Sequence, residues 1–81
     1  MAKLRVLSGA DMIAIFSSFD FAVASQKGSH IKVVRMVEEK RQILTVPNHK
    51  EIDKGTLKAI FRQACVFIPE SDLNPHFYHE Q

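Results

Sequence analysis

The spacing of three strand-like segments in the middle of the chain restricts the fold more than any other sequence feature. Residues 21–25, 30–37 and 42–46 are rich in β-branched or alternating side chains, and each predicts a strand. Only four residues separate each segment from the next. Parallel neighbours need a connection of about a dozen residues or more, so these segments must form an antiparallel meander. Gly28, in the first connection, can take the positive φ that a tight turn requires.

Amphipathic segments on either side of the strands predict two helices. Ser8 and Asp11 resemble a capping box at the start of residues 9–18, where apolar side chains recur at helical spacing. Asp53 is a suitable N-cap for a second helix over residues 54–66. The apolar stripe of this second helix consists of Leu57, Ile60, Phe61 and Ala64.

The order α-β-β-β-α predicts an α+β fold in which the two helices lie on one face of a three-stranded antiparallel sheet. This is the layout of a double-stranded-RNA-binding-type domain, and its second sheet face stays open to solvent or to a partner. A chain of 81 residues allows one modest core. Residues 1–68 should form this domain, and residues 69–81 a tail. Pro69 and Pro75 leave room there for a short helical turn at most.

The cations are concentrated in the body of the chain. Residues 1–65 hold all eleven Lys and Arg against six acids, whereas residues 66–81 hold three acids and no Lys or Arg. This division indicates a polyanionic partner for the body, although an ordinary surface excess of cations also explains it. A single cysteine, no signal-peptide pattern and no apolar run of about 20 residues predict a cytoplasmic protein without a membrane segment.

His30 is the first candidate for chemistry. It follows the Gly28-Ser29 turn and begins a strand, with Lys27 before it and Lys32 two residues later on the same strand face. Metal-free RNA cleavage needs a base for the 2′-hydroxyl proton and positive charge near the phosphate. A neutral imidazole supplies the first, and the two lysines supply the second. The alternative is an exposed histidine at the start of a strand with no chemical role.

The start of the second helix is the next candidate, because a helix N-terminus carries the positive end of the dipole and suits a phosphate. His49, in the preceding loop, is a second proton-transfer group, a phosphate contact or a plain loop residue. His76 and His79 lack the further ligand pair that a metal site needs, so no metal and no cofactor are expected. The candidate phosphate contacts of this region are Lys50, Lys54, Gly55, Lys58 and Arg62.

Taken in order along the chain, these segments resemble the HicA (YcfA-like) family of small toxins from bacterial toxin–antitoxin pairs. The resemblance covers roughly residues 7–66, and the tail at residues 74–79 has no counterpart in it. Where the family has Gly-Phe before the first strand, this chain has Asp20-Phe21, so the geometry of that turn is expected to differ. The matching strings are Leu7-Ser8-Gly9, Gln26-Lys27-Gly28-Ser29-His30, Leu44-Thr45-Val46-Pro47 with His49, Lys54-Gly55-Thr56-Leu57 and Ile60-Phe61-Arg62-Gln63-Ala64.

The resemblance implies the toxin component of a type II pair, an mRNA interferase that cleaves RNA without a metal cofactor. It places His30 at the family's catalytic histidine and implies a HicB-type antitoxin that binds the toxin and buries this site. Two other functions stay open on the residues alone. One is a non-catalytic RNA-binding module of the same fold, and the other is a subunit whose sheet face binds only another protein.

Overall fold

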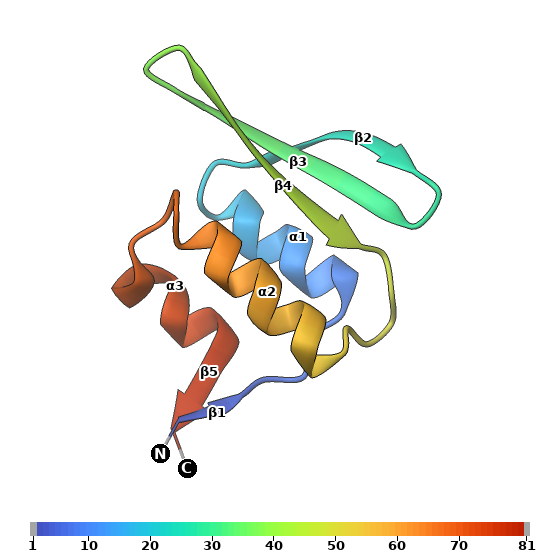
Figure 1. Ribbon diagram of the computed structural model, residues 1–81, viewed down its shortest axis with the longest axis vertical. Coiled ribbons are helices and arrows are strands. Elements are labelled where there is room, and N and C mark those ends of the chain that lie inside the picture. Colours follow the sequence, from blue (N-terminus) through green and yellow to red (C-terminus); the bar gives the residue numbers. More distant parts are fainter. Residues whose placement is uncertain (1, 81) are drawn as a thin grey trace.

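Three antiparallel strands form the main sheet of the structure, a computed structural model that describes residues 2–80 (Figure 1). They are β2 (Ala22–Lys27), β3 (His30–Val37) and β4 (Lys40–Pro47), in the order β2-β3-β4. Both neighbours of β3 run antiparallel to it. The predicted meander is confirmed, and β3 has the bounds that the sequence indicated.

Both hairpin turns are shorter than the four-residue connections predicted, because β2 and β4 extend further toward them. Lys27 pairs with His30, which leaves Gly28 and Ser29 as the turn, and Gly28 has a φ of 60°. Val37 pairs with Lys40 across Glu38-Glu39, whose φ values are 50° and 68°. A positive φ at both central residues is the conformation of a type I′ turn, which matches the twist of the flanking strands.

Two helices lie side by side on one face of the sheet, as predicted (Figure 1). They are α1 (Gly9–Ser17) and α2 (Lys54–Ala64), one and two residues shorter than expected at their ends. The capping box of α1 is confirmed. The Ser8 hydroxyl accepts from the Asp11 amide at 3.0 Å, and the Asp11 carboxylate accepts from the Ser8 amide at 2.9 Å. Capping satisfies amides that have no partner within the first helical turn.

The turn between α1 and β2 places Asp20 in the left-handed region, with a φ of 72°. The Phe21 amide donates to the Phe16 carbonyl at 3.0 Å, and the Asp20 amide donates to that of Ser17 at 3.0 Å. This pair of bonds defines a Schellman motif, whose left-handed position is usually a glycine. Asp20 therefore adopts the conformation that glycine favours, which a short polar side chain tolerates.

The C-terminal segment is more ordered than the single turn predicted for it. Helix α3 spans Glu70–Phe77, and β5 (Tyr78–Glu80) pairs antiparallel with β1 (Ala2–Leu4), a strand that the sequence did not indicate. Leu73 and Phe77, one helical turn apart, are completely buried. The free energy gained by burying these two side chains outweighs the cost of the backbone hydrogen bond that Pro75 removes from α3. β1 and β5, which are far apart in the sequence, consequently lie side by side (Figure 1).

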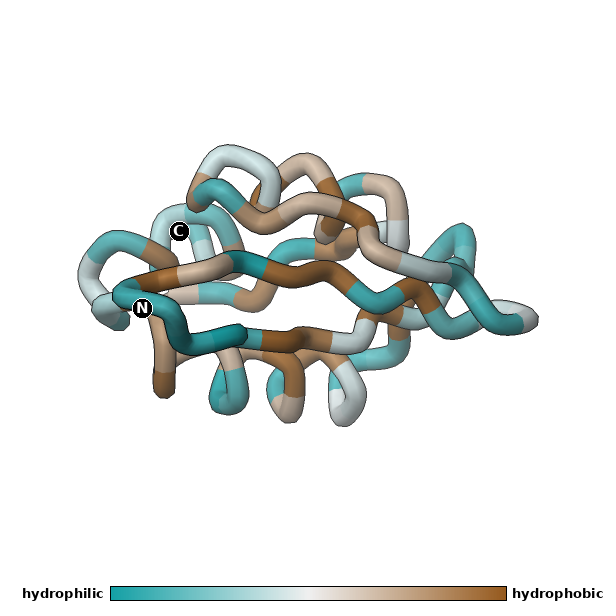
Figure 2. The backbone as a smooth tube through the Cα atoms, turned by 90° about the horizontal axis from the view of Figure 1, so that it is seen from above, coloured by the Kyte–Doolittle hydropathy of each residue, from teal (hydrophilic) through white to brown (hydrophobic). Residues whose placement is uncertain are grey.

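The core lies between the sheet and the helices, and it also includes the C-terminal segment. Exposed and buried residues alternate from His30 to Val33 and from Ile43 to Val46, so this part of the sheet is buried on one face. Hydrophobic and hydrophilic stretches accordingly follow one another along the backbone (Figure 2). No helix in residues 2–80 is long and apolar enough to cross a bilayer. The buried core residues are Leu7, Met12, Phe16, Phe21, Ile31, Val33, Leu44, Val46, Ile52, Leu57, Ile60, Ala64, Ile68, Leu73 and Phe77.

Arg35 connects the sheet to the ends of both helices. Its guanidinium donates to the Gln42 side chain at 2.8 Å, to the Phe19 carbonyl at 3.1 Å and to the Phe67 carbonyl at 2.9 Å. It also lies over the Phe21 ring, 4.8 Å from the ring centroid. These carbonyls follow α1 and α2, so one planar, multiply donating group holds three segments together.

Replacing Arg35 should therefore destabilise the fold strongly. We expect Arg35→Met to lower the free energy of unfolding by about 2–4 kcal/mol, because it leaves half-buried carbonyl groups without donors. Arg35→Lys should recover only part of this loss, since one ammonium cannot reach three acceptors that diverge. Urea unfolding of the three proteins measures the difference, and equal stability of Arg35→Lys and the wild type would contradict it.

Candidate functional site

His30 lies on the open face of the sheet, at the end next to the β2–β3 turn. Ile31 and Val33 are buried against the helices, so the alternating residues His30 and Lys32 face the other way and are exposed. Lys27 is directly opposite His30 in the register. Directly paired residues of an antiparallel ladder point to the same face, with Cα atoms about 5.5 Å apart. The structure thus brings Lys27, His30 and Lys32 together on one exposed surface.

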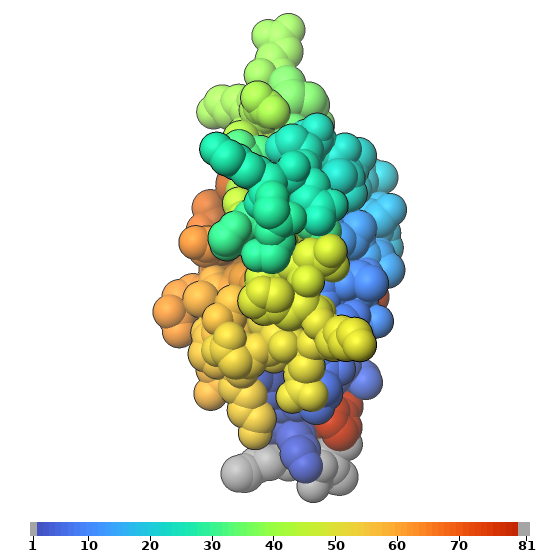
Figure 3. All heavy atoms as spheres, turned by 90° about the vertical axis from the view of Figure 1, so that its right-hand side faces the viewer, coloured from blue at the N-terminus to red at the C-terminus, as the bar shows by residue number. Residues whose placement is uncertain are grey.

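The turn that carries His30 is fixed to the loop that follows β4. The Asn48 amide donates to the Ser29 carbonyl at 2.6 Å, and the Gly9 amide donates to the His49 carbonyl at 2.8 Å. Figure 3 shows the turn (green) directly above this loop (yellow), with α1 (blue) beside them. The backbone of the loop therefore bridges the His30 turn and the start of α1.

Gly9 allows this close approach. A Cβ atom at this position would meet the Pro47 carbonyl oxygen and would lie 2.9 Å from the Asn48 Cα. Beside this contact, Ser8, Ala10, Asn48, His49 and Lys50 line a shallow hollow. His49 and Lys50 are exposed there, and they directly follow Asn48, whose amide binds the His30 turn.

The start of α2 already has an internal anion. The Asp53 carboxylate accepts from the Thr56 amide at 3.0 Å and from its hydroxyl at 2.7 Å, which confirms the predicted N-cap. These two hydrogen bonds hold the pKa of Asp53 below its usual value. A phosphate near Lys54 and Gly55 would share this helix end with the Asp53 carboxylate. The exposed Lys54 ammonium would therefore bind it more strongly than the Gly55 amide.

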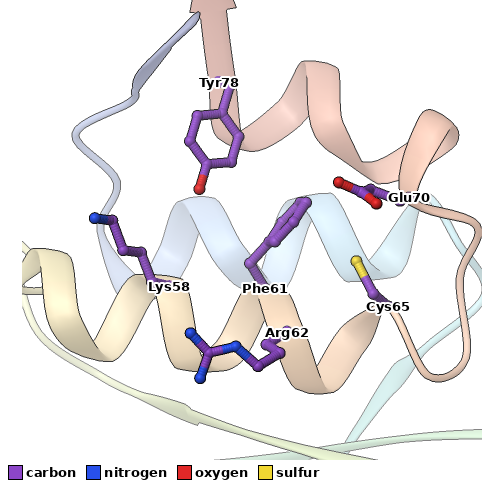
Figure 4. Close-up of a pocket in the computed structure, with 6 residues that line it drawn as sticks. All are labelled: Lys58, Phe61, Arg62, Cys65, Glu70 and Tyr78. Carbon is purple, nitrogen blue, oxygen red and sulfur yellow. The ribbon is translucent and has the colours of Figure 1, made fainter.

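Lys58 and Arg62 belong to a separate surface. With Phe61 and Cys65 of α2 they line a hollow against α3 and β5, where Glu70 and Tyr78 close the other side (Figure 4). Since α2 lies on the helical face of the sheet, this hollow is not on the His30 face. Burial and the nearby Glu70 raise the pKa of the Cys65 thiol, so the thiol stays protonated at neutral pH.

Some residues of these surfaces had no signal in the sequence. Asn48 is important through its backbone amide, which any residue except proline supplies. Glu70 and Tyr78 enter the hollow on α2 only because the C-terminal segment folds back. Gly9 had a detectable signal, since glycine at the first position of a helix indicates a close backbone contact.

The Asp53 cap makes the stability depend on pH in a defined direction. Because the folded-state pKa of Asp53 is lowered, its stabilising effect is complete above the unfolded-state pKa and is lost as the pH falls through the folded-state pKa. Asp53→Asn keeps a capping oxygen but cannot titrate. Between about pH 5 and about pH 3, the wild type should lose stability more steeply than Asp53→Asn. Thermal unfolding across this range tests it, and parallel curves would show that the cap does not titrate with folding.

Gly9→Ala should displace the loop that follows β4. The added methyl group meets backbone atoms that cannot move independently, and we expect a loss of about 1–3 kcal/mol. Gly28→Ala is the matched control, since no atom lies within 4 Å of its Cβ and only its φ of 60° is unfavourable. Both variants should unfold more easily, but only Gly9→Ala should shift the backbone NMR signals of His49, whose carbonyl accepts from the Gly9 amide. Unchanged signals in Gly9→Ala would mean that the loop tolerates the contact.

Comparison with known proteins identifies the family. No curated protein sequence and no solved structure matches the chain. The profile of one family, described as the HicA toxin of bacterial toxin–antitoxin systems, matches residues 9–66. This region contains α1, the whole three-stranded sheet and α2, and therefore His30 with both neighbouring lysines. The protein thus belongs to the HicA toxin family and is a toxin of a bacterial toxin–antitoxin system.

Proposed function

We propose that this toxin is an mRNA interferase, an endoribonuclease that needs no metal ion and uses His30 as its general base. The observation that carries the proposal is the placement of an exposed imidazole between Lys27 and Lys32 on the open sheet face, within the region that matches the toxin family. An open surface suits a polymer, because a long RNA chain can reach it without threading into a cavity.

The reaction uses a nucleophile that RNA itself provides. His30 takes the proton of a 2′-hydroxyl, and the resulting oxygen attacks the adjacent phosphorus. The bond from phosphorus to the 5′-oxygen breaks, and this oxygen takes a proton from water. The products are a 2′,3′-cyclic phosphate and a free 5′-hydroxyl. DNA lacks the attacking hydroxyl, so it is not a substrate.

The cations around His30 stabilise the charge that develops on the phosphate and position the RNA backbone. Negative charge grows on the phosphate oxygens during attack, and the ammonium groups of Lys27 and Lys32 stabilise it. The backbone of Gly28 and Ser29 lies beside the phosphate at the turn. Lys50 and Lys54 continue the cationic path along the loop to the start of α2, where they hold the RNA backbone without reading its sequence.

The remaining candidates have supporting roles in the proposal. His49 contributes a phosphate contact next to the His30 turn, while Lys58 and Arg62 contact RNA that extends around α2. A HicB-type antitoxin covers the His30 surface and keeps the toxin inactive in the cytoplasm, where mRNA is present. Growth arrest follows when the antitoxin is lost.

A chimeric oligonucleotide tests the chemistry directly. Its strand is DNA except for a short RNA segment, it carries a fluorophore and a quencher, and the buffer contains EDTA. The wild type should cleave it, and His30→Ala should be slower by a factor of about 100 or more, as expected for loss of a general base. Replacing the attacking 2′-hydroxyl by 2′-O-methyl should also stop cleavage, and mass spectrometry should find the cyclic phosphate.

Two controls separate catalysis from binding and folding. His76→Ala removes an exposed histidine that packs against Phe19, away from the turn, and should cleave at the wild-type rate. RNA affinity of His30→Ala, measured by fluorescence anisotropy, should stay close to that of the wild type. Equal cleavage by His30→Ala and the wild type would overturn the role of His30. Binding without cleavage by the wild type would indicate a non-catalytic RNA-binding module.

A further inference from the structure

The outer edge of β4 is the least protected part of the sheet. β4 pairs with β3 on one side only, and no other strand in residues 2–80 covers its second side. The opposite edge strand, β2, is interrupted by a bulge between Val23 and Ser25, which disturbs strand addition there. The register of β4 with β3 is continuous from Lys40 to Pro47. A regular, unpaired edge of this kind can accept another strand.

The turn between β3 and β4 determines which backbone groups face outward. A two-residue hairpin turn makes its flanking pair, Val37 and Lys40, a hydrogen-bonded pair, and the pattern then alternates along the ladder. Arg41, Ile43 and Thr45 are therefore the residues whose N–H and C=O groups point away from β3. Pro47 occupies the next outward position. Its lack of an N–H group therefore does not interrupt the hydrogen bonds between β4 and β3.

A hollow next to this edge provides side-chain contacts. Three residues of β4 form one wall, and Gln63, Val66 and Phe67 at the end of α2 form the other. Val66 is 77% exposed and Ile43 is 39% exposed, and both line this hollow. A strand added to β4 would place every second side chain over this apolar hollow.

The charges around the edge indicate the chemistry of its occupant. Lys40 and Arg41 lie at the start of β4, next to Glu38 and Glu39 of the turn, which offset their charge. Lys32 pairs with Thr45 on the neighbouring strand, and Arg62 precedes Gln63 on α2. No Asp or Glu lines the hollow. A second copy of this chain, paired antiparallel along β4, would bring Arg41 of each copy toward the Lys32–Thr45 pair of the other, cation toward cation. RNA also fits poorly, because phosphate oxygens only accept hydrogen bonds, whereas this edge presents carbonyl oxygens as well as amides.

We propose that the β4 edge binds an extended segment of a partner protein, with apolar residues alternating along it and acidic residues at its ends. The segment pairs with Ile43 and Thr45 through main-chain hydrogen bonds and places apolar side chains over Val66 and Phe67. This is β-strand addition, in which the backbone supplies affinity and alternate side chains supply specificity. The main-chain groups that bind this segment belong to β4, which takes no part in the RNA chemistry assigned to His30, so the proposal stands or falls separately.

Amide hydrogen exchange measured by NMR tests the edge without knowledge of the natural partner. In the free protein, the Ile43 and Thr45 amides should exchange much faster than the Gln42 and Leu44 amides. The probe is a synthetic peptide, Glu-Val-Thr-Val-Thr-Val-Glu, added in excess. It should slow exchange selectively at Ile43 and Thr45. Its N-methylated form, which lacks the backbone donors, should leave exchange unchanged.

Matched variants test the contacts on the protein side. Val66→Glu changes an exposed residue without touching the core, and it should weaken peptide binding by about tenfold or more through repulsion of the acidic peptide. Val66→Lys, at the same position, should retain or strengthen binding. A version of the peptide with Lys in place of Glu should reverse this order.

Several outcomes would overturn the proposal. One is no binding of the acidic peptide, and another is binding without protection of Ile43 and Thr45. Protection of these amides that grows with protein concentration alone would show that a second copy occupies the edge. None of these measurements involves RNA cleavage, so a failure here is distinguishable from a failure of the His30 assignment.

Discussion

The rest of the structure depends on which side chains of β3 face the core and which face outward. Pairing on both sides fixes every residue of this strand to one face or the other. Ile31 and Val33 then contribute to the core, while His30 and Lys32 face outward. A shift by one residue would bury His30 and expose Ile31 and Val33. The same alternation of side chains directs Arg35 toward the helices, where it donates to carbonyls at the ends of α1 and α2.

The region that matches the toxin family does not complete the core by itself. Phe77, in α3, packs against Phe16 of α1 at 6.4 Å and against Phe61 of α2 at 5.0 Å between ring centroids. Pairing of β1 with β5 then holds this segment in place. Contacts from outside residues 9–66 thus cover the side of α2 that faces away from the sheet. Lys58 and Arg62 line a hollow against this segment, on the face of the sheet opposite His30.

The positive charge of the body is consequently divided between surfaces with different surroundings. Around His30 the lysines lie on an open face that suits a polyanion. At the start of α2, Asp53 already accepts from the Thr56 amide and offsets part of the helix dipole. Along β4 the cations border an apolar hollow and a peptide edge, which suits a protein segment. Net charge alone indicates none of these differences.

The sequence by itself determined the meander, both helices with their caps, and the candidate His30, because turn residues, capping residues and apolar spacing are local signals. It missed β1, α3 and β5, whose formation depends on Leu73 and Phe77 reaching a core built by distant residues. Only the tertiary structure placed Asn48 against Ser29, and Lys58 beside Tyr78. Such contacts join residues far apart in the chain, and the packing of the whole core, rather than any local pattern, brings them together.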